Sequence, residues 1–261
     1  MPSSAPTLLP LTSSVETTLL ASEELWARAH DSSDTRGVRE DDGVAEIVRV
    51  GGERGELVLR RREGDGALEL RVNGVFVMDD RETSSEELLA SAALASVRRP
   101  SRVLVGGLGL GYTVRALLAD DRLGEVVVAE IEPELVAWMR SGLVPSVLDD
   151  PRVSVVVGDV RAVVADSPDG SYDAILLDVD NGPDFLVYNE NSAIYSSSFF
   201  TVCRSKLRAG GVLTVWSSSS SEPLRAAVAA VFGSCEVTPV PVALQGRGET
   251  YYVYQGLFST A

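Results

Sequence analysis

Four glycines within six residues follow an apolar segment in VLVGGLGLGYT, residues 103–113. A glycine-rich turn between a strand and a helix presents backbone N–H groups and a helix N-terminus, which together bind nucleotides. The dinucleotide fingerprint is G-x-G-x-x-G, whereas the spacing here is G-x-G-x-G, one residue shorter. Such turns also serve close strand–helix packing alone. We expect a nucleoside site that includes Gly106, Gly107, Gly109 and Gly111.

Two acidic residues follow the next apolar segments. Glu130 ends VVVAE and precedes Ile131, and its carboxylate can accept hydrogen bonds from both hydroxyls of a ribose. Asp159 stands between Gly158 and Val160 in VVVGDV, where it could accept from the amine of an adenine. Capping of the following helix explains an Asp at this position almost as well.

A third acidic group lies where the apolar segment YDAILLD ends. Asp178 is the candidate catalytic base, with Asp180 two residues later as a second candidate. A carboxylate there can attract a cationic amine and then accept its proton. The loop that follows, NGPDFLVYNENSAIY, is long enough for a lid and carries the candidate substrate contacts Tyr188, Asn189 and Glu190. Solvent exposure is the alternative for these three loop residues.

Alternation along the chain indicates the elements that position these groups. Residues 43–80 contain short alternating runs separated by GGERG, EGDG and NG, which predict a small antiparallel β-sheet. Residues 82–97 predict a helix, with Ser84 or Ser85 as its cap. From residue 102 onward, apolar strands alternate with helices, which predicts an α/β domain with a parallel sheet covered on both faces.

The C-terminal end breaks the alternation. EVTPVPVAL and TYYVYQGLF are joined only by QGRGE, so they predict a hairpin whose last strand runs antiparallel to its neighbour. The expected organisation is a flexible or partly helical leader over residues 1–42, a small β-sheet domain over 43–80 and a Rossmann-like transferase domain over 81–261. A short helix around Glu23–Ala29 is expected within the leader.

Composition narrows the function. The net charge of −15 argues against nucleic-acid binding, because the chain would repel phosphates. No run of 18 apolar residues predicts a membrane span, and no basic segment begins a secretory signal, so we expect a cytoplasmic protein. Two distant cysteines and a single histidine predict neither a metal site nor a disulfide framework.

This combination resembles the seven-stranded fold of class I S-adenosylmethionine-dependent methyltransferases. Over residues 43–257 it is most similar to spermidine synthases, which also carry a small N-terminal sheet. The motifs L-x-G-x-x-Q-x-x-x-x-D-E and Y-x-E-M of that family resemble LRVNGVFVMDDRETSSEEL at 70–88, and Y-D-x-I-x-x-D-S-x-D-P resembles YDAILLDVDNGP at 172–183. L-F-T-x-x-F-Y resembles IYSSSFF at 194–200, and L-K-P-G-G-x-L resembles LRAGGVL at 207–213. The resemblance implies Asp178 as the catalytic carboxylate and a homodimer.

Several functional positions differ from that family. The turn G-G-G-D-G-G reads GGLGLG here, so the Asp that holds the amine of decarboxylated S-adenosylmethionine falls on Gly109. The glutamine falls near Val77, the tyrosine on Ser85 and the histidine on Ser91. An Asp would repel the carboxylate of S-adenosylmethionine by roughly 1 kcal/mol in water at about 4 Å, and by more at lower dielectric. Its loss removes this barrier to the ordinary cofactor.

The expected function is therefore S-adenosylmethionine-dependent transfer, of a methyl group, to a small amine. The alternative is a polyamine aminopropyltransferase, a spermidine synthase that uses decarboxylated S-adenosylmethionine. A third hypothesis is a non-catalytic nucleoside-binding module, and the glycine spacing disfavours a fourth, an NAD-dependent oxidoreductase.

Overall fold

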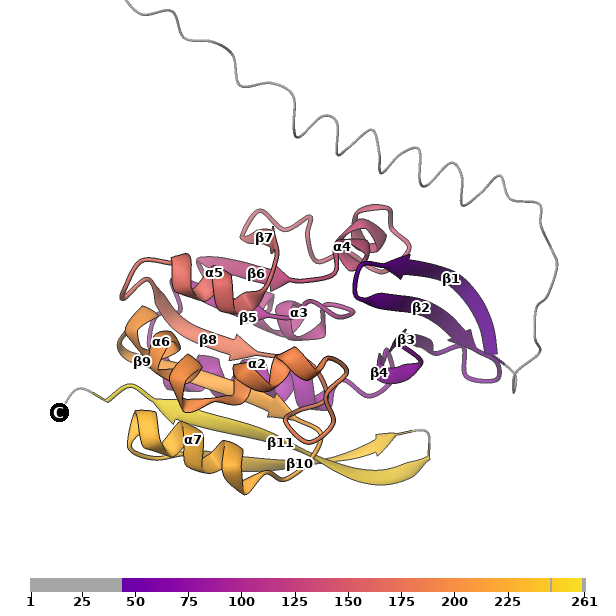
Figure 1. The fold of residues 1–261 in the computed structure, drawn as a ribbon. Helices are drawn as coiled ribbons and strands as arrows, with labels where there is room; N and C mark the ends of the chain where they lie inside the picture. The colour runs from indigo at the N-terminus through magenta and orange to yellow at the C-terminus, as the bar shows by residue number, and fades with distance from the viewer. Residues whose placement is uncertain (1–43, 245, 260–261) are drawn as a thin grey trace, which may run out of the picture. The chain divides into compact units, whose positions relative to one another are not determined.

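The structure is a computed structural model that describes residues 44–244 and 246–259. The predicted leader over 1–42, with its expected helix at Glu23–Ala29, lies outside the described residues. The described residues form one compact unit that contains two β-sheets (Figure 1). No helix in the described part of the chain is long and apolar enough to cross a bilayer.

The small sheet has four antiparallel strands, each paired with the next: β1 (Val44–Gly52), β2 (Gly55–Arg62), β3 (Leu68–Val72) and β4 (Val75–Asp79). The turn before β4 contains Asn73 and Gly74, whose φ values are 51° and 77°. Positive φ at both central residues defines the two-residue hairpin turn that Asn-Gly favours. Leu57, Leu59 and Leu70 are fully buried, so alternation puts one face of this sheet against the core.

Helix α2 (Ser84–Ser96) connects the small sheet to the rest of the unit. Its cap residue is Thr83, so the predicted caps Ser84 and Ser85 are wrong and both lie in the first turn. Thr83 donates its hydroxyl to the carboxylate of Glu87 (3.0 Å) rather than capping a backbone N–H with its side chain.

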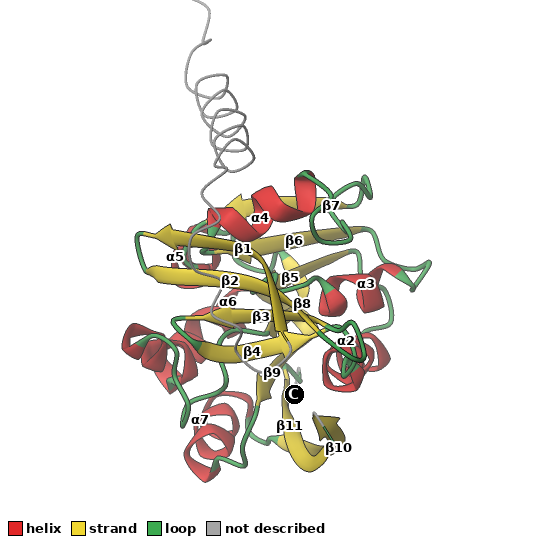
Figure 2. Cartoon of the chain, turned by 90° about the vertical axis from the view of Figure 1, so that its right-hand side faces the viewer, coloured by secondary structure: helices red, strands yellow, loops and turns green. Residues whose placement is uncertain are grey.

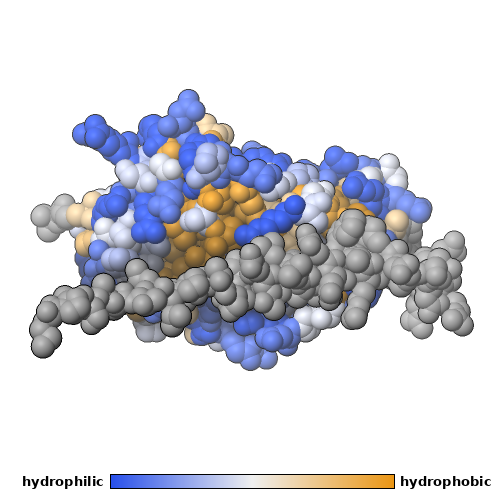
Figure 3. All heavy atoms as spheres, turned by 90° about the horizontal axis from the view of Figure 1, so that it is seen from above, coloured by the Kyte–Doolittle hydropathy of each residue, from blue (hydrophilic) through white to orange (hydrophobic). Residues whose placement is uncertain are grey.

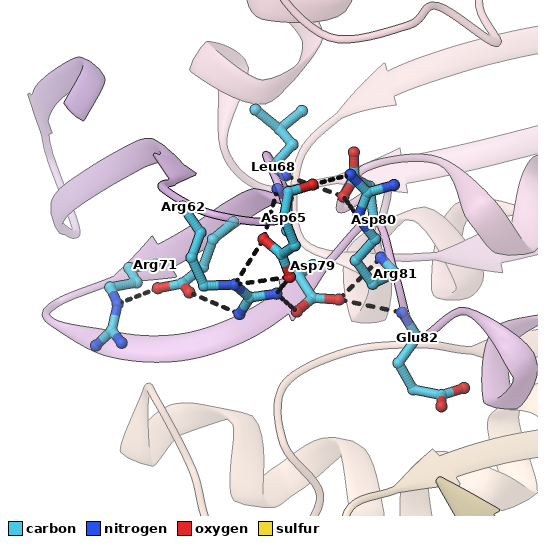
Figure 4. Close-up of polar contacts among 10 residues, drawn as sticks. Arg62, Asp65, Leu68, Arg71, Asp79, Asp80, Arg81 and Glu82 are labelled. Atoms are coloured by element: carbon cyan, nitrogen blue, oxygen red, sulfur yellow. Dashed lines mark hydrogen bonds and ion pairs between the residues drawn. The ribbon is translucent and has the colours of Figure 1, made fainter. Parts of the chain in front are cut away.

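A network of buried charges holds the corner between β4 and α2 (Figure 4). Asp79 is 2% exposed and accepts from the guanidinium of Arg62 at 3.0 Å. Its other oxygen accepts the backbone N–H groups of Arg81 (2.9 Å) and Glu82 (3.1 Å). A second buried carboxylate, Glu69, lies 3.7 Å from the same guanidinium. Both buried carboxylates, Asp79 and Glu69, therefore have a cation beside them.

Seven strands form the larger sheet: β5 (Arg102–Gly106), β6 (Glu125–Glu130), β7 (Val153–Val157), β8 (Tyr172–Leu177), β9 (Leu207–Ser217), β10 (Glu236–Leu244) and β11 (Arg247–Leu257). Their order is β10-β11-β9-β8-β5-β6-β7. β11 runs antiparallel to both of its neighbours, while β9, β8, β5, β6 and β7 pair in parallel. The predicted fold, a mixed seven-stranded sheet preceded by a small antiparallel sheet, is confirmed.

Helices cover both faces of this sheet because its strands alternate between two cores. In β5, Val103 and Val105 belong to one buried cluster and Leu104 to the other. The first cluster includes α2 and two further helices, α3 (Tyr112–Leu118) and α4 (Pro133–Arg140). The second includes α5 (Val160–Asp166), α6 (Ser197–Lys206) and α7 (Glu222–Phe232). A 3₁₀ helix, η1 (Asn189–Tyr195), interrupts the long loop after β8.

The small sheet lies at the carboxyl edge of the parallel strands. The arrowheads of β6 and β8 point toward it in Figure 1, and Figure 2 shows its strands in front of the larger sheet. Open α/β sheets bind ligands at this edge, outside the ends of the strands. The two sheets therefore provide opposite walls for a site.

One edge strand of the larger sheet leaves apolar side chains exposed to solvent. Edge strand β7 has Val156 and Val157 exposed by 42% and 51%. Figure 3 looks down on the side of the unit where β7 and α4 lie and shows an apolar area bordered by hydrophilic side chains. An unpaired edge strand of this kind can form contacts with another chain.

We expect Arg62→Leu to lower the free energy of unfolding by about 3–5 kcal/mol, because it leaves Asp79 buried without its cation. Urea unfolding followed by circular dichroism measures the change. Arg49→Ala is the matched control, since Arg49 is 47% exposed beside Glu46, and it should cost about 0–1 kcal/mol. Equal losses in the two variants would contradict this prediction.

Candidate active site

A cavity of about 130 Å³ opens between the carboxyl edge of the larger sheet and the small sheet. Ten of the predicted site residues line it: Gly107, Gly109, Glu130, Ile131, Gly158, Asp159, Val160, Asp178, Asp180 and Tyr188. Four others do not: Gly106, Gly111, Asn189 and Glu190. Its wall on the side of the small sheet includes Leu70, Val72, Val77 and Met78. The predicted nucleoside and catalytic residues are thus brought to one place.

The glycine turn is shaped by close packing as well as by the cavity. Gly107 has a φ of +93°, and a Cβ there would lie 2.0 Å from the carbonyl oxygen of Asp178. At Gly106 a Cβ would meet Val160, and Gly111 begins α3 with a left-handed conformation. The two glycines outside the lining, Gly106 and Gly111, are therefore explained by packing and by the turn itself.

A side chain from the small sheet covers the middle of this turn. The Sδ atom of Met78 lies 3.2 Å from the backbone nitrogen of Leu110. A Cβ on Gly109 would be only 2.6 Å from the same sulfur. Met78 therefore occupies the space that a larger residue at position 109 would need.

Glu130 connects the turn to the end of β6. It is 5% exposed, and its two carboxylate oxygens accept the backbone N–H groups of Leu108 and Glu132, each at 2.7 Å. Burial raises the pKa of Glu130 to about 6. A carboxylate has about four acceptor positions, so two remain for hydroxyls of a ligand.

Asp159 caps helix α5, as its alternative interpretation predicted. Its carboxylate accepts the backbone N–H of Arg161 at 2.8 Å and pairs with the guanidinium of that residue at 2.6 Å. These contacts with Arg161 lower the pKa of Asp159. Its neighbour Gly158 is not required by close packing, because a Cβ added there would meet nothing within 4 Å.

Asp178 lies directly after β8 at the floor of the cavity. Its carboxylate accepts a hydrogen bond from the Thr113 hydroxyl at 2.6 Å. Burial raises the pKa of Asp178 to about 6, partly offset by Thr113. No ion pair to Asp178 is found within the described ranges, so its charge faces the cavity without a cation.

Asp180 holds the loop that covers the cavity. Its φ is 64°, and its carboxylate accepts the backbone N–H groups of Asn181 (2.8 Å), Val187 (2.6 Å) and Tyr188 (3.3 Å). The side-chain amide of Asn191 adds a fourth hydrogen bond at 2.9 Å. A carboxylate with four donors is a poor proton acceptor, so we interpret Asp180 as a positioning residue.

Further contacts tie this loop to both sheets. Tyr188 donates its hydroxyl to Glu132, two residues after β6 (3.0 Å), and Asn181 donates its side-chain amide to the carbonyl of Phe76 in β4 (3.2 Å). Asn189 and Glu190 are exposed, in agreement with the alternative stated for them. Asn191, the next residue, lines the cavity instead.

The sequence analysis missed Glu86 as a lining residue. It is 6% exposed in the first turn of α2, and within the described residues its only side-chain hydrogen bond comes from the Ser85 hydroxyl at 2.6 Å. Burial and the nearby charge of Asp178 raise the pKa of Glu86 to about 7. A signal was available, because Glu86 is spaced from Ala90 and Ala93 so as to lie on the buried stripe of the helix.

Substitution can distinguish a glycine that close packing requires, Gly107, from one that faces open space, Gly158. Gly107→Ala should lower the free energy of unfolding by at least about 1–3 kcal/mol, because it combines positive φ with a backbone clash. Gly158→Ala should stay within about 0.5 kcal/mol of the wild type, since its Cβ enters open space. Calorimetry with adenosine should show weaker binding for Gly158→Ala despite normal stability. Unchanged affinity would place the nucleoside elsewhere.

Stability should depend on pH through the buried carboxyl groups. Asp178, Glu86 and Glu130 all have raised pKa values, so the folded chain binds more protons than the unfolded chain between about pH 4 and pH 7. Stability therefore falls as pH rises through this window.

We expect Glu86→Gln to reduce the loss of unfolding free energy between pH 5 and pH 7.5 by on the order of 1–3 kcal/mol. Urea unfolding at the two pH values measures this loss. Glu87→Gln, on the exposed face of the same helix turn, should leave it unchanged. A wild-type chain that is more stable at pH 7.5 than at pH 5 would refute the assignment of these shifts.

Comparisons with known proteins agree with this arrangement. The family model described as "Spermine/spermidine synthase domain" matches residues 82–230. Polyamine aminopropyltransferase 2 of Pseudomonas aeruginosa is 33% identical over 141 residues, which are 51% of this chain and 38% of that protein. Putrescine N-methyltransferase 4 of Nicotiana tabacum is 29% identical over 153 residues, which are 57% of this chain and 36% of that protein. The chain thus spans less than half of the length of these curated relatives.

Solved structures share the fold. A spermidine synthase in complex with the transition-state analogue AdoDATO has a TM-score of 0.74 at 16% identity, covering 83% of this chain and 75% of that one. The spermidine synthase of Thermotoga maritima has a TM-score of 0.70 at 16% identity, covering 83% and 74%. Since the family model matches more than half of the 261 residues, the chain belongs to the spermine/spermidine synthase family.

Proposed function

We propose that this chain transfers an alkyl group from a sulfonium nucleoside to an amine nitrogen of a polyamine. The first candidate is the aminopropyl group of decarboxylated S-adenosylmethionine. The observation that carries the proposal is Asp178, a carboxylate without a cation at the floor of a cavity that also contains the glycine turn and Glu130. The matching of residues 82–230 to the family supports it.

The residues of the cavity suit a nucleoside. Glu130 keeps acceptor positions for ribose hydroxyls, and the open space at Gly158 leaves room beside Asp159 for a flat base. The glycine turn presents bare backbone, so the sugar and tail of a nucleoside without a pyrophosphate can lie close to it. The nucleoside would supply a carbon atom activated by the positively charged sulfur.

Asp178 would act on the acceptor amine. A primary amine is protonated near neutral pH, and the charge of Asp178 would attract it into the cavity. With a pKa of about 6, Asp178 can then accept the proton directly or through a water molecule. The C–N bond forms as the C–S bond breaks, and the electron pair of the broken bond stays on the sulfur. The loop held by Asp180 would limit access of water during this step.

Methyl transfer from S-adenosylmethionine is the second candidate, because one observation favours it. Gly109 leaves the turn without a carboxylate, and Met78 fills the adjacent space with an uncharged thioether. The carboxylate on the tail of S-adenosylmethionine would meet no like charge from the turn itself. The relatives include both aminopropyltransferases and putrescine N-methyltransferases.

The test is incubation of the protein with each of the two nucleosides and with putrescine or spermidine, followed by mass spectrometry of the products. Asp178→Asn should lower kcat by about 10²–10⁴-fold, as expected for loss of a general base. Asp169→Asn, in which the replaced side chain is 77% exposed, should retain full activity.

Three results would change the proposal. Product from S-adenosylmethionine alone would replace the first candidate with the second. Full activity of Asp178→Asn would show that another group accepts the proton. Nucleoside binding without product from any amine would favour a non-catalytic binding module. The homodimer expected from the family stays a prediction, which light scattering of the purified protein would test.

A further inference from the structure

Among the acidic side chains that line the cavity, Glu86 is the one whose position the proposed reaction leaves unexplained. It is 6% exposed, yet its only side-chain hydrogen bond among residues 44–244 and 246–259 is the one from the neutral Ser85 hydroxyl to Oε2. Its Oε1 atom has no partner in the described part of the chain. A carboxylate withdrawn from water without a cation is costly, and such groups persist where a ligand completes them.

The other buried carboxylates of the described chain have a cation, a backbone donor or, in Glu132, the Tyr188 hydroxyl together with the nearby charge of Arg54. Asp79 is paired with Arg62, and Asp173 with Arg208 at 2.6 Å. Glu130 accepts two backbone N–H groups. Glu86 has neither a cation nor a backbone donor from another residue. The difference indicates that Glu86 is not a structural ion-pair member.

The charges around Glu86 make its ionisation more costly still. Asp178 and Glu82 are close enough to raise the pKa of Glu86 further, and no Lys or Arg in the described residues offsets them. Trp216 lines the same cavity, and aromatic rings attract ammonium groups. A carboxylate beside a second carboxylate and an aromatic ring is the chemistry that recognises a primary ammonium.

The position of Met78 indicates which ammonium this is. Met78 lines the cavity together with Glu86, and its sulfur lies against Leu110 and Gly109 of the glycine turn. Glu86 therefore lines the same cavity as the turn, along which the tail of a bound nucleoside would lie. Because Met78 leaves no room for a carboxylate on residue 109, an ammonium on that tail must find its counter-charge elsewhere.

We propose that Glu86 holds the primary ammonium of the aminopropyl tail of the nucleoside, and that it selects this tail over one that also bears a carboxylate. The inference rests on the proposed function, because it assigns the charged group that aminopropyl transfer requires in this chain. Ser85 is a positioning residue for Glu86 through its hydroxyl.

Isothermal titration calorimetry on the full chain tests the assignment with three ligands. They are decarboxylated S-adenosylmethionine, S-adenosylmethionine, and 5′-methylthioadenosine, which lacks the charged tail. Glu86→Gln should weaken the first by about 10–100-fold and leave 5′-methylthioadenosine within about twofold of the wild type. The preference of the wild type for the decarboxylated ligand over S-adenosylmethionine should disappear in this variant.

Two further variants serve as controls. Glu87→Gln removes an equal charge from the exposed side of the same helix turn and should bind all three ligands as the wild type does. Glu86→Asp keeps the charge and should bind the decarboxylated ligand more tightly than Glu86→Gln. Thermal unfolding verifies that each variant is folded.

The outcomes separate this inference from the proposed function. Equal weakening of all three ligands by Glu86→Gln, or no weakening of the decarboxylated one, would overturn the role of Glu86 while leaving polyamine product formation as it is. A wild-type chain that prefers S-adenosylmethionine would also overturn it. A Glu86-dependent preference without any polyamine product would uphold the inference about binding and contradict the proposed reaction.

Discussion

The structure depends on one electrostatic constraint: two carboxylates, Asp178 and Glu86, are withdrawn from water in one cavity without a cation. Each makes the ionisation of the other more costly, so their protons belong to the pair as much as to either residue. Such a pair is unfavourable in the free chain and becomes favourable when a cation enters. The acidic character of the whole chain, with a net charge of −15, would help to attract that cation.

The remaining elements hold in place the backbone around these two carboxylates. The corner between β4 and α2, which precedes Glu86, is held by Asp79 and the guanidinium of Arg62. On the other side, the floor of the cavity is held because the carbonyl of Asp178 packs against Gly107, where no Cβ fits. The paired charges in the small sheet thus fix the backbone from which the unpaired charge projects. Carboxylates that have a cation thus stabilise the fold, whereas the carboxylates without one mark the candidate site.

The differences from the spermidine synthase motifs can be understood as one linked change in the cavity. Position 109 has lost its side chain, and Met78 fills the space that remains. Val77, near which the glutamine of the motif falls, lines the cavity, and Ser85 donates its hydroxyl to Glu86 where the motif has a tyrosine. With Glu86 as the proposed counter-charge, the cavity keeps a carboxylate for the tail although the turn has none. Ser91, at the position of the histidine, is exposed and has no part in the cavity.

The sequence alone determined the alternation of strands and helices, because continuous apolar runs such as those before Gly106 and Asp178 can be buried only in a sheet that is covered on both faces. It also determined that the last strand is antiparallel, since the link between the final two strands is too short for a crossover. It placed Glu130 and Asp178 together, since parallel strands end at one edge.

Only the tertiary structure decided what each polar group does there. Asp180 belongs to the loop because four donors converge on it from residues up to 11 positions away. Met78 and Glu86 reached the cavity because the small sheet and α2 pack over a strand edge that is distant in sequence. Spacing along the chain reports the face on which a residue lies, whereas its partners come from elements that only packing brings together.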